Sequence, residues 1–358
     1  MRILILGGGV IGTSIAYHLA ARGAQVVVIE RTAVACAASG KSGGFLALDW
    51  CDGTPLMRLA RRSFVRHAEL AEELGGDWGY RRMTTYAGSV GRFVSRTSRG
   101  AGPEWLSRDV TVDGQLGSIG TTAQVHPAAF TLAMMRAAEA HGAALKPGRA
   151  TGLLRKGNTV TGVQIDGDVL EGDAVVVAMG PWSMLAARWL PLPPVYGLKG
   201  HSLVFETGTT LPAEALFLEY AEATGSILSP EVFPRADGTT YVCGVSSEAA
   251  VPIDPGKVEP DDDAIDRLKA LCAHISPVLA TSRILASQAC YRPVTADGLP
   301  LIGAIPNAPG AYVATGHSVW GILNGPATGE AMAELILDGA TRTVDLSPFD
   351  PARLEASV

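Results

Sequence analysis

The sequence predicts an α/β protein in which a parallel sheet flanked by helices is combined with a second sheet. The first 30 residues have the pattern strand, glycine-rich turn, helix, strand, which is typical of a βαβ unit. Residues 195–206 and 226–245 have the pattern of strands that belong to another sheet. The chain of 358 residues exceeds most single hydrophobic cores, and no linker or internal repeat divides it. We therefore expect two interleaved domains.

The composition excludes several classes of protein. The 35 acidic and 29 basic residues give a net charge of −6, and only 18% of residues are charged. Binding to the phosphates of nucleic acid needs a clustered basic face, which this sequence lacks. The 47% hydrophobic content argues against disorder. No uncharged apolar stretch reaches the ~18 residues expected of a membrane span, so we expect none.

The cysteines indicate a reducing compartment. They are odd in number, scattered and without a CxxC pair, which fits neither a disulfide framework nor a zinc site. Arg2 and the apolar run that follows resemble a signal peptide, but glycines interrupt that run at a spacing with its own explanation. We expect a cytoplasmic protein without a bound metal. The five cysteines are Cys36, Cys51, Cys243, Cys272 and Cys290.

The N-terminal elements follow from local patterning. Residues 2–6 are apolar after the first position and predict a short buried strand, and a helix is expected from the glycine turn to about residue 22. Residues 25–29 form a second β-branched run that ends on Glu30. Residues 35–48, rich in Ala, Gly and Ser, are expected to form an ordered loop against a ligand. The apolar periodicity of residues 55–74 predicts a helix.

The later elements are shorter and separated by turns. A helix is predicted over residues 127–141, and strands near 152–155, 160–165 and 174–178 are separated by Gly-Asn and Asp-Gly turns. A helix over 261–274 begins with three aspartates, which suit the positive end of its dipole. The C-terminal part reads as a strand at 311–314, a glycine-bearing loop, and a helix that begins near Pro326 and ends near Gly339.

The glycine run after the first strand predicts a nucleotide site. In the pattern Gly7-x-Gly9-x-x-Gly12, the first glycine permits a tight turn, the second lets the backbone approach a pyrophosphate, and the third allows close packing of helix and strand. Glu30 ends the next strand, where a carboxylate accepts hydrogen bonds from ribose hydroxyls. A purely structural glycine turn is the alternative. The register of strand, helix and acid favours the nucleotide.

The extended pattern favours FAD over NAD. It continues to Ala16 and Gly23 and gives GxGxxGxxxAxxxxxxG, which looks like the FAD-binding form. No second GxGxxG follows, although flavin reductases that use a pyridine nucleotide often need such a second site. The hydride is therefore expected to come from a small organic substrate.

Four motifs at matching separations run through the chain. They are the N-terminal unit, the loop 38–44 (ASGKSGG), the segment 176–183 (VVAMGPWS), and the run 292–303 (RPVTADGLPLIG), which is followed by Thr315-Gly316-His317 and Trp320-Gly321-Ile322. Together they resemble the D-amino-acid oxidase family of FAD enzymes, especially its glycine oxidase and sarcosine oxidase branches. The resemblance extends essentially from end to end.

The resemblance implies both architecture and chemistry. It implies a doubly wound, Rossmann-type FAD domain assembled from residues 1–80, 118–192 and 292–358, and an interleaved substrate domain of antiparallel sheet plus helices from residues 81–117 and 193–291. Relatives oxidise an amine carbon by hydride transfer to flavin N5, after which the imine hydrolyses in water and oxygen or another acceptor takes the electrons. The loop 316–323 should border the flavin pyrimidine. The helix near Pro326 should aim its N-terminus there, where its dipole stabilises negative charge on reduced flavin.

The resemblance also predicts which residues contact FAD. They lie in the glycine turn, the loop after the second strand, the middle segment and the C-terminal loop. They are Gly7, Gly9, Val10, Ile11, Gly12, Glu30, Arg31, Ser39, Gly40, Lys41, Ser42, Gly43, Gly44, Ala150, Ala178, Met179, Gly180, Trp182, Cys290, Gly316, His317, Trp320, Gly321, Ile322 and Leu323.

Two charged residues are the predicted catalytic pair. Arg292 occupies the position where glycine-oxidase-like enzymes bind the substrate carboxylate, and a guanidinium suits this by forming two parallel N–H bonds. Glu231 stands where the family places an aromatic substrate-binding residue, and a carboxylate there should recruit an ammonium or accept a proton. The family's second arginine is replaced by Val319, a departure from the glycine oxidase pattern. The alternatives are an arginine that ties the domains together and an exposed glutamate.

Other residues have open alternatives. Cys290 lies seven residues before Asp297, a spacing at which sarcosine-oxidase-like enzymes attach the flavin covalently, and a small buried thiol is the alternative. Lys41 and Lys199 are candidates for promoting reactivity with oxygen, or surface lysines. Trp50 and Trp320 are expected to line the substrate pocket.

The predicted function is FAD-dependent oxidation of the C–N bond of a small amine or amino acid, with reoxidation by oxygen. Two alternatives remain at this point. A dehydrogenase that passes electrons to a quinone or protein would share every motif, and a flavin-binding protein with an interaction role would share the cofactor site. The oligomeric state and the substrate are not indicated by the sequence.

Overall fold

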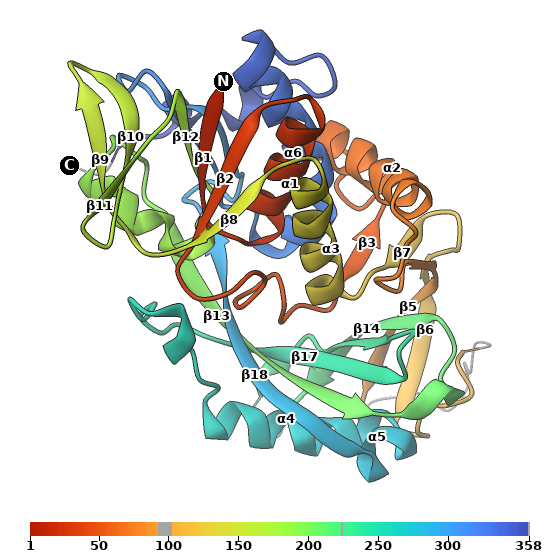
Figure 1. Cartoon of the computed structure of the whole chain (residues 1–358). Helices are drawn as coiled ribbons and strands as arrows, with labels where there is room; N and C mark the ends of the chain where they lie inside the picture. Colours follow the sequence, from red (N-terminus) through yellow and green to blue (C-terminus); the bar gives the residue numbers. More distant parts are fainter. Residues whose placement is uncertain (92–101, 223–224, 357–358) are drawn as a thin grey trace.

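The computed structural model describes residues 1–91, 102–222 and 225–356 and contains two large sheets (Figure 1). The six-stranded sheet has the order β19-β20-β12-β1-β2-β8, and its strands are parallel except that β19 runs antiparallel to β20. Its strands are β1 (Arg2–Leu6), β2 (Gln25–Glu30), β8 (Ala144–Pro147), β12 (Ala174–Val177), β19 (Leu301–Ala304) and β20 (Ala311–Thr315). The predicted α/β class is confirmed.

Different layers cover the two faces of this sheet. Three helices, α1 (Val10–Ala21), α3 (Pro127–Ala140) and α6 (Gly321–Asp338), enclose a core against one face, and α2 (Met57–Glu73) packs on α6. The other face packs against a three-stranded antiparallel sheet of β9 (Ala150–Lys156), β10 (Thr159–Ile165) and β11 (Asp168–Glu171), and against the 3-10 helix η1 (Gly180–Arg188). The sheet is therefore buried on both sides, which explains its nearly all-apolar strands.

The second large sheet has eight strands in the order β18-β13-β17-β16-β14-β5-β6, with β15 paired to β14. Its two longest strands, β13 and β18, extend from below the six-stranded sheet across the lower half of the molecule in Figure 1. The strands are β5 (Thr84–Val90), β6 (Val110–Gly117), β13 (Tyr196–Glu206), β14 (Glu214–Ala221), β15 (Ile227–Leu228), β16 (Glu231–Pro234), β17 (Thr239–Ser247) and β18 (Arg283–Val294).

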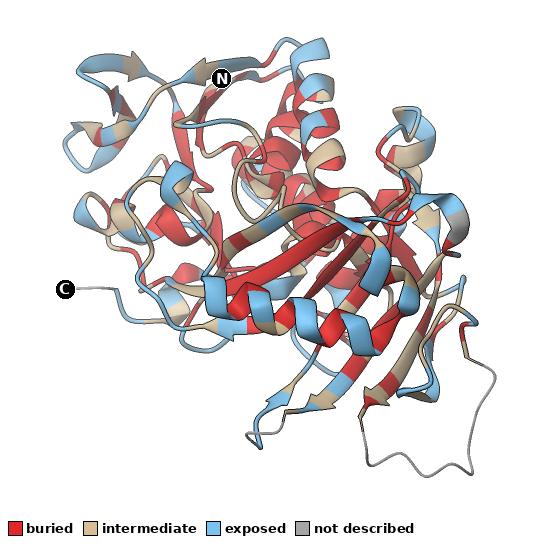
Figure 2. Cartoon of the chain, turned by 90° about the horizontal axis from the view of Figure 1, so that it is seen from below, coloured by how far each residue is buried: buried red, intermediate tan, exposed pale blue. Residues whose placement is uncertain are grey.

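The two faces of the eight-stranded sheet have different roles. Helix α4 (Asp262–Ile275), followed by the short α5 (Pro277–Thr281), packs on the outer face and buries an aliphatic core there. Figure 2 shows α4 with its outward side exposed and the sheet behind it buried. The inner face carries a smaller cluster that includes Phe233, Tyr241 and Cys243. This inner face forms one wall of the candidate site described below.

A small sheet completes the fold. It has the order β3-β7-β4 and joins β3 (Phe45–Ala47), β7 (Thr122–Gln124) and β4 (Arg81–Arg82). Within the described residues, no helix is both long enough and apolar enough to cross a membrane.

The last helix begins earlier than the sequence predicted. The prediction placed its start near Pro326, but α6 begins at Gly321 and contains Pro326. Proline has no N–H to donate to the carbonyl four residues back, and its ring disturbs the neighbouring bond. Two side chains of α2 replace what is lost: His67 Nε2 lies 2.9 Å from Ile322 O and 3.2 Å from Leu323 O, and Ser63 Oγ accepts from the Ala327 N–H at 3.1 Å. The predicted loop 316–323 is correspondingly shorter.

Candidate active site

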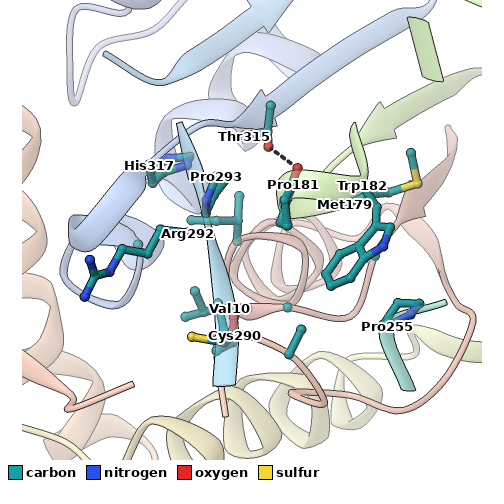
Figure 3. Close-up of a pocket in the computed structure, with 18 of the residues that line it drawn as sticks. Val10, Met179, Pro181, Trp182, Pro255, Cys290, Arg292, Pro293, Thr315 and His317 are labelled. Carbon is teal, nitrogen blue, oxygen red and sulfur yellow. Dashed lines mark hydrogen bonds between the residues drawn. The ribbon is translucent and has the colours of Figure 1, made fainter. Parts of the chain in front are cut away.

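A cavity of about 570 Å³ lies between the six-stranded sheet and the inner face of the eight-stranded sheet. Its walls come from the glycine turn, the loop after β2, the segment after β12, the start of α6, and strands β13, β14, β16, β17 and β18. It thus opens at the carboxyl ends of parallel strands, where α/β folds bind their ligands. Figure 3 shows Arg292 and Cys290 on β18 and Trp182 on the opposite side of that strand.

The glycine turn joins β1 tightly to α1. Gly7 has φ of +112°, and a Cβ there would lie 2.4 Å from Ala178 O, so only glycine fits. A Cβ on Gly12 would lie 2.0 Å from Gly7 O, which is the close approach of helix and strand that the motif predicted. A Cβ on Gly9 would meet only Ser39 Oγ, at 3.2 Å. Gly9 therefore leaves backbone surface open at the cavity rather than filling a packing requirement.

The first turn of α1 borders the cavity. Helix N-termini have N–H groups without intrahelical partners, and Val10 and Ile11 of this turn line the cavity. The Val10 N–H donates to Ser39 Oγ at 2.9 Å. The Glu30 carboxylate accepts from the Gly8 N–H at 2.7 Å and from the Thr32 N–H at 2.8 Å, which fixes it at the edge of the cavity. This combination of a helix N-terminus at the cavity and a positioned carboxylate fits a dinucleotide.

Two further polar atoms at the wall fit a polar ligand. Ser42 Oγ and His317 Nδ1 are buried and have no hydrogen-bond partner among the residues that the structure describes. His317 Nε2 lies 3.1 Å from Thr328 Oγ1, and burial lowers the pKa of His317 to about 3, so the ring is neutral. A cofactor with carbonyl and amide edges, such as the FAD that the motif predicted, would supply partners for both atoms.

Most residues predicted to contact the cofactor line this cavity, and both predicted catalytic residues do so too. The lining residues from that prediction are Gly7, Gly9, Val10, Ile11, Glu30, Arg31, Ser39, Ser42, Gly43, Gly44, Ala150, Ala178, Met179, Gly180, Trp182, Cys290, His317, Trp320, Gly321 and Ile322.

Five residues from the same prediction are not among the lining residues that the structure describes, and their positions follow from packing. A Cβ on Gly40 would lie 2.1 Å from Ala35 O, and Gly316 has φ of +79°, so both serve loop geometry. Leu323 is buried in the helical core. Lys41 Nζ donates to Ala289 O at 3.2 Å. The fifth is Gly12, described above.

Lys199 faces away from the cavity. It is buried on β13, and its ammonium pairs with Asp261 at the start of α4, on the outer face of the sheet. Its position therefore gives no support to the hypothesis that it promotes the reactivity of the cofactor with oxygen.

Arg292 reaches across β13. Its neighbour in register on that strand is Leu198, and Gly200 pairs with Cys290 on one side and Ser246 on the other. The guanidinium lies over Gly200, where a Cβ would be 3.5 Å from Nη2, and Nη1 donates to Ser246 Oγ at 3.3 Å. The charge therefore lies over β13 and reaches the edge of β17.

Glu231 lies on the same inner face. It pairs in register with Phe217 of β14 and with Cys243 of β17, whose Sγ donates to Oε2 at 3.5 Å. Burial raises the pKa of the Glu231 carboxyl, and the positive charge of Arg292 opposes this rise. The two predicted catalytic residues therefore line one cavity close enough to interact electrostatically, although they are 61 residues apart in sequence.

Cys290 lies on β18, pairs in register with Gly200 of β13, and lines the cavity. Burial raises the pKa of its thiol, while Arg292 and Lys41 act in the opposite direction. A thiolate at this position is accordingly disfavoured until a ligand or cofactor changes its surroundings.

Sequence reasoning missed two features of the site. Three half-buried aromatic side chains, Phe45, Trp50 and Phe217, form one group at the wall, and only Trp50 was singled out. The segment 250–255 also covers part of the cavity. It is held by the Trp182 Nε1–H and by Arg31 Nη1, which donate to Pro252 O and Ile253 O, both at 2.7 Å. Neither feature has a local spacing signal, because each depends on contacts between distant segments.

Comparisons with known proteins agree with this geometry. The model of the DAO family, described as FAD dependent oxidoreductase, matches residues 2–335. The chain is 30% identical to the uncharacterized oxidoreductase YurR of Bacillus subtilis, covering 98% of each chain. It is 28% identical to glycine oxidase of Geobacillus kaustophilus, covering 98% of this chain and 96% of the enzyme. The crystal structure of that organism's glycine oxidase superposes with a TM-score of 0.83 at 24% identity, covering 98% and 99% of the two chains.

Proposed function

The chain belongs to the DAO family of FAD-dependent oxidoreductases, and from that premise we propose that it oxidises the C–N bond of a small amine or amino acid. The observation that carries this proposal is the pair Arg292 and Glu231 in the cavity that the glycine turn also lines. Opposite charges on one apolar wall suit a zwitterionic ligand. The similarity to glycine oxidases also supports oxidation of a C–N bond.

Arg292 would bind and orient the substrate carboxylate. A guanidinium can offer two parallel N–H bonds to a carboxylate, which fixes both charge and direction. Its contact with Ser246 and its position over Gly200 restrict the side chain before the ligand arrives. That restriction lowers the entropy lost on binding.

Glu231 would hold the amine and take its proton. A neutral amine is the form that can release a hydride from the adjacent carbon, so an ammonium substrate must first lose a proton. Burial raises the pKa of Glu231, which makes it a stronger base than an exposed carboxylate. When bound, FAD supplies the redox chemistry by accepting the hydride. The aromatic side chains at the wall exclude water from this point.

The FAD contacts, the domain division and the electron acceptor are further parts of the proposal. We assign FAD to the twenty lining residues named above, and we keep residues 1–80, 118–192 and 292–358 as the FAD domain and 81–117 and 193–291 as the substrate domain. Oxygen is the proposed acceptor, and a small molecule is the proposed partner. All five cysteines are free, which supports a cytoplasmic location.

An anaerobic screen of flavin bleaching tests the function. Amines, N-methyl amino acids and D-amino acids are mixed with the holoenzyme, and loss of flavin absorbance reports reduction. Admission of air should then restore the colour and form peroxide; rapid dye reduction with little peroxide would instead indicate another acceptor. If no amine bleaches the flavin, the proposed activity is wrong.

Substitution of the charged pair tests the roles. Arg292→Ala should lower kcat/KM about 30-fold or more, because removing one partner of a buried charge pair costs about 2–5 kcal/mol. Arg292→Lys keeps the charge but loses the planar fork, so substrate affinity should fall without loss of FAD. Arg136→Ala, at an exposed position that is not among the cavity lining, is the matched control. Wild-type efficiency in both Arg292 variants would remove Arg292 from the mechanism.

A further inference from the structure

The wall beyond Glu231 carries a compact aromatic group. The ring centroids of Phe45 and Trp50 are 4.9 Å apart, those of Phe45 and Phe217 are 5.0 Å apart, and those of Trp50 and Phe217 are 4.8 Å apart. We call these three residues the aromatic triad. They come from β3, the loop after it, and β14, so their meeting depends on the tertiary fold.

The triad is a lining surface rather than closed core. Each of its side chains is only half-buried, whereas Phe233, which also borders the cavity, is 1% exposed and packs against Gly43. Three large rings that keep part of their surface exposed to the cavity favour an apolar ligand group.

The order of groups along the sheet sets the direction of a ligand. Strand order is β18-β13-β17-β16-β14. The Arg292 guanidinium extends from β18 over β13 to Ser246 of β17, Glu231 follows on β16, and Phe217 follows on β14 as the direct register partner of Glu231. A positive charge, a carboxylate and an aromatic surface therefore succeed one another across the inner face.

We propose that this site selects carboxylated amines whose nitrogen carries a bulky apolar substituent. The inference rests on the proposed function and names its substrate class. The carboxylate would bind Arg292, and the nitrogen would lie at Glu231. A substituent on nitrogen then continues past Glu231 into the triad. A substituent on the α-carbon would instead branch off between Arg292 and Glu231, toward Cys243 and Cys290, where the neighbouring ring of Tyr241 is only 5% exposed, in contrast to the half-buried rings of the triad.

The aromatic rings add a second reason for an amine at this position. A cationic nitrogen beside ring faces gains cation–π attraction, and alkylated ammonium groups are bound well in this way because they are weakly hydrated. Glu231 and Phe217, adjacent across two strands, would hold the same nitrogen by charge and by ring surface together.

Anaerobic stopped-flow titration of the holoenzyme tests the proposal. It yields Kd whether or not a compound reduces the flavin, because bound ligands also perturb the flavin spectrum. The probes are glycine, N-methylglycine, N-benzylglycine, both enantiomers of phenylalanine, and 3-phenylpropionate, which lacks the amine. N-benzylglycine should bind at least 10-fold more tightly than glycine and more tightly than either phenylalanine enantiomer.

Two variants test whether the aromatic triad causes the preference for N-benzylglycine. Trp50→Leu and Phe217→Leu should each reduce the preference for N-benzylglycine over glycine to less than 3-fold, because each variant weakens the binding of N-benzylglycine more than that of glycine. Tyr196→Leu replaces a 51% exposed aromatic residue that is not among the cavity lining and should preserve the preference. Glu231→Gln should weaken binding of the amines but not of 3-phenylpropionate. FAD content and melting temperature show whether each variant is folded.

The outcomes separate this inference from the proposed function. A preference below 3-fold in the wild type, a preference that survives both triad variants, or tighter binding of phenylalanine would each overturn the substrate class. If amines bleach the flavin without such a preference, the function stands and the inference fails. If N-benzylglycine binds selectively but no amine bleaches the flavin, the function fails and the assignment of the triad stands.

Discussion

The hydrogen bonds by which His67 and Ser63 of α2 replace those lost at Pro326 of α6 lead to a quantitative prediction about stability. His67 contacts two carbonyl oxygens, so the proton must be on Nε2, and burial lowers the pKa of His67 to about 4, which keeps the ring neutral. His67→Leu keeps a side chain of similar size but leaves the buried carbonyls of Ile322 and Leu323 without this donor. An unsatisfied buried polar group costs about 1–3 kcal/mol, and we expect that loss in the free energy of unfolding.

A double-mutant cycle identifies the cause of this loss. Pro326→Ala restores a backbone N–H that can donate to Ile322 O, so the carbonyl no longer depends on α2. The cost of His67→Leu should therefore fall by about 1 kcal/mol or more in the Pro326→Ala background. Loss of the ring contact between His67 and Phe130, whose centroids are 4.7 Å apart, would be the same in both backgrounds and cancels in the cycle.

Urea titration followed by far-UV circular dichroism measures these costs. FAD is kept at one fixed excess, because a cofactor that binds only the folded state raises the apparent stability. His141→Leu, the same exchange at an exposed position, should change stability by no more than about 0.5 kcal/mol. An equal cost of His67→Leu with and without Pro326 would refute the proposed role of His67.

Three further predictions concern the cofactor and pH. Gly9→Val should abolish FAD binding, measured as flavin absorbance per chain, because a side chain would fill the space left for the pyrophosphate; retention of the full flavin content would contradict the nucleotide site. If Cys290 attaches FAD, acid precipitation should leave the yellow colour with the wild-type protein, and Cys290→Ser should release it; colour in the wild-type supernatant would mean a merely packed thiol. Burial lowers the pKa values of His18, His67 and His317 to about 3, 4 and 3. Below pH 6.5 the unfolded chain therefore binds more protons than the folded chain, and the free energy of unfolding should fall as the pH decreases. The expected loss is roughly 1.4 kcal/mol per pH unit for each histidine, until the pH reaches that histidine's pKa in the folded state. A urea midpoint equal at pH 6.5 and 5 would contradict that assignment.

The sequence predicted best those elements whose signals are local. The pattern of residues 2–30 gave β1, α1 and β2 to within one residue, because apolar runs and the glycine turn lie within the unit itself. The strands β3, β4 and β7 were not predicted. They have two or three residues each, and β3 pairs with β7 across more than 70 residues of chain, so their existence depends on tertiary pairing. Strand β18 was also missed, because Ser287, Gln288 and the small residues around them weaken its apolar pattern.

The residues of the candidate site also differ in how well the sequence predicts them. The glycine turn was visible as spacing, and Arg292 and Glu231 were visible only through the resemblance to a family. The aromatic triad was invisible except for Trp50, because its members come from three segments and have no common period. The position of the Arg292 guanidinium over Gly200 depends on the pairing of β18 with β13, which the sequence does not reveal until the register is known.

The error at Pro326 links the core to the candidate site. A helix that began at Pro326 would start five residues later than α6, which shortens it by about 7.5 Å at 1.5 Å per residue. Its N-terminus would then lie away from Trp320, Gly321 and Ile322, which line the cavity. The positive end of the helix dipole acts within its first turn, so the earlier start is what places that favourable field for negative charge at the cavity. Ile322 lines the cavity, and its carbonyl oxygen accepts a hydrogen bond from His67 Nε2. The buried contact between α2 and α6 therefore also positions this wall of the site.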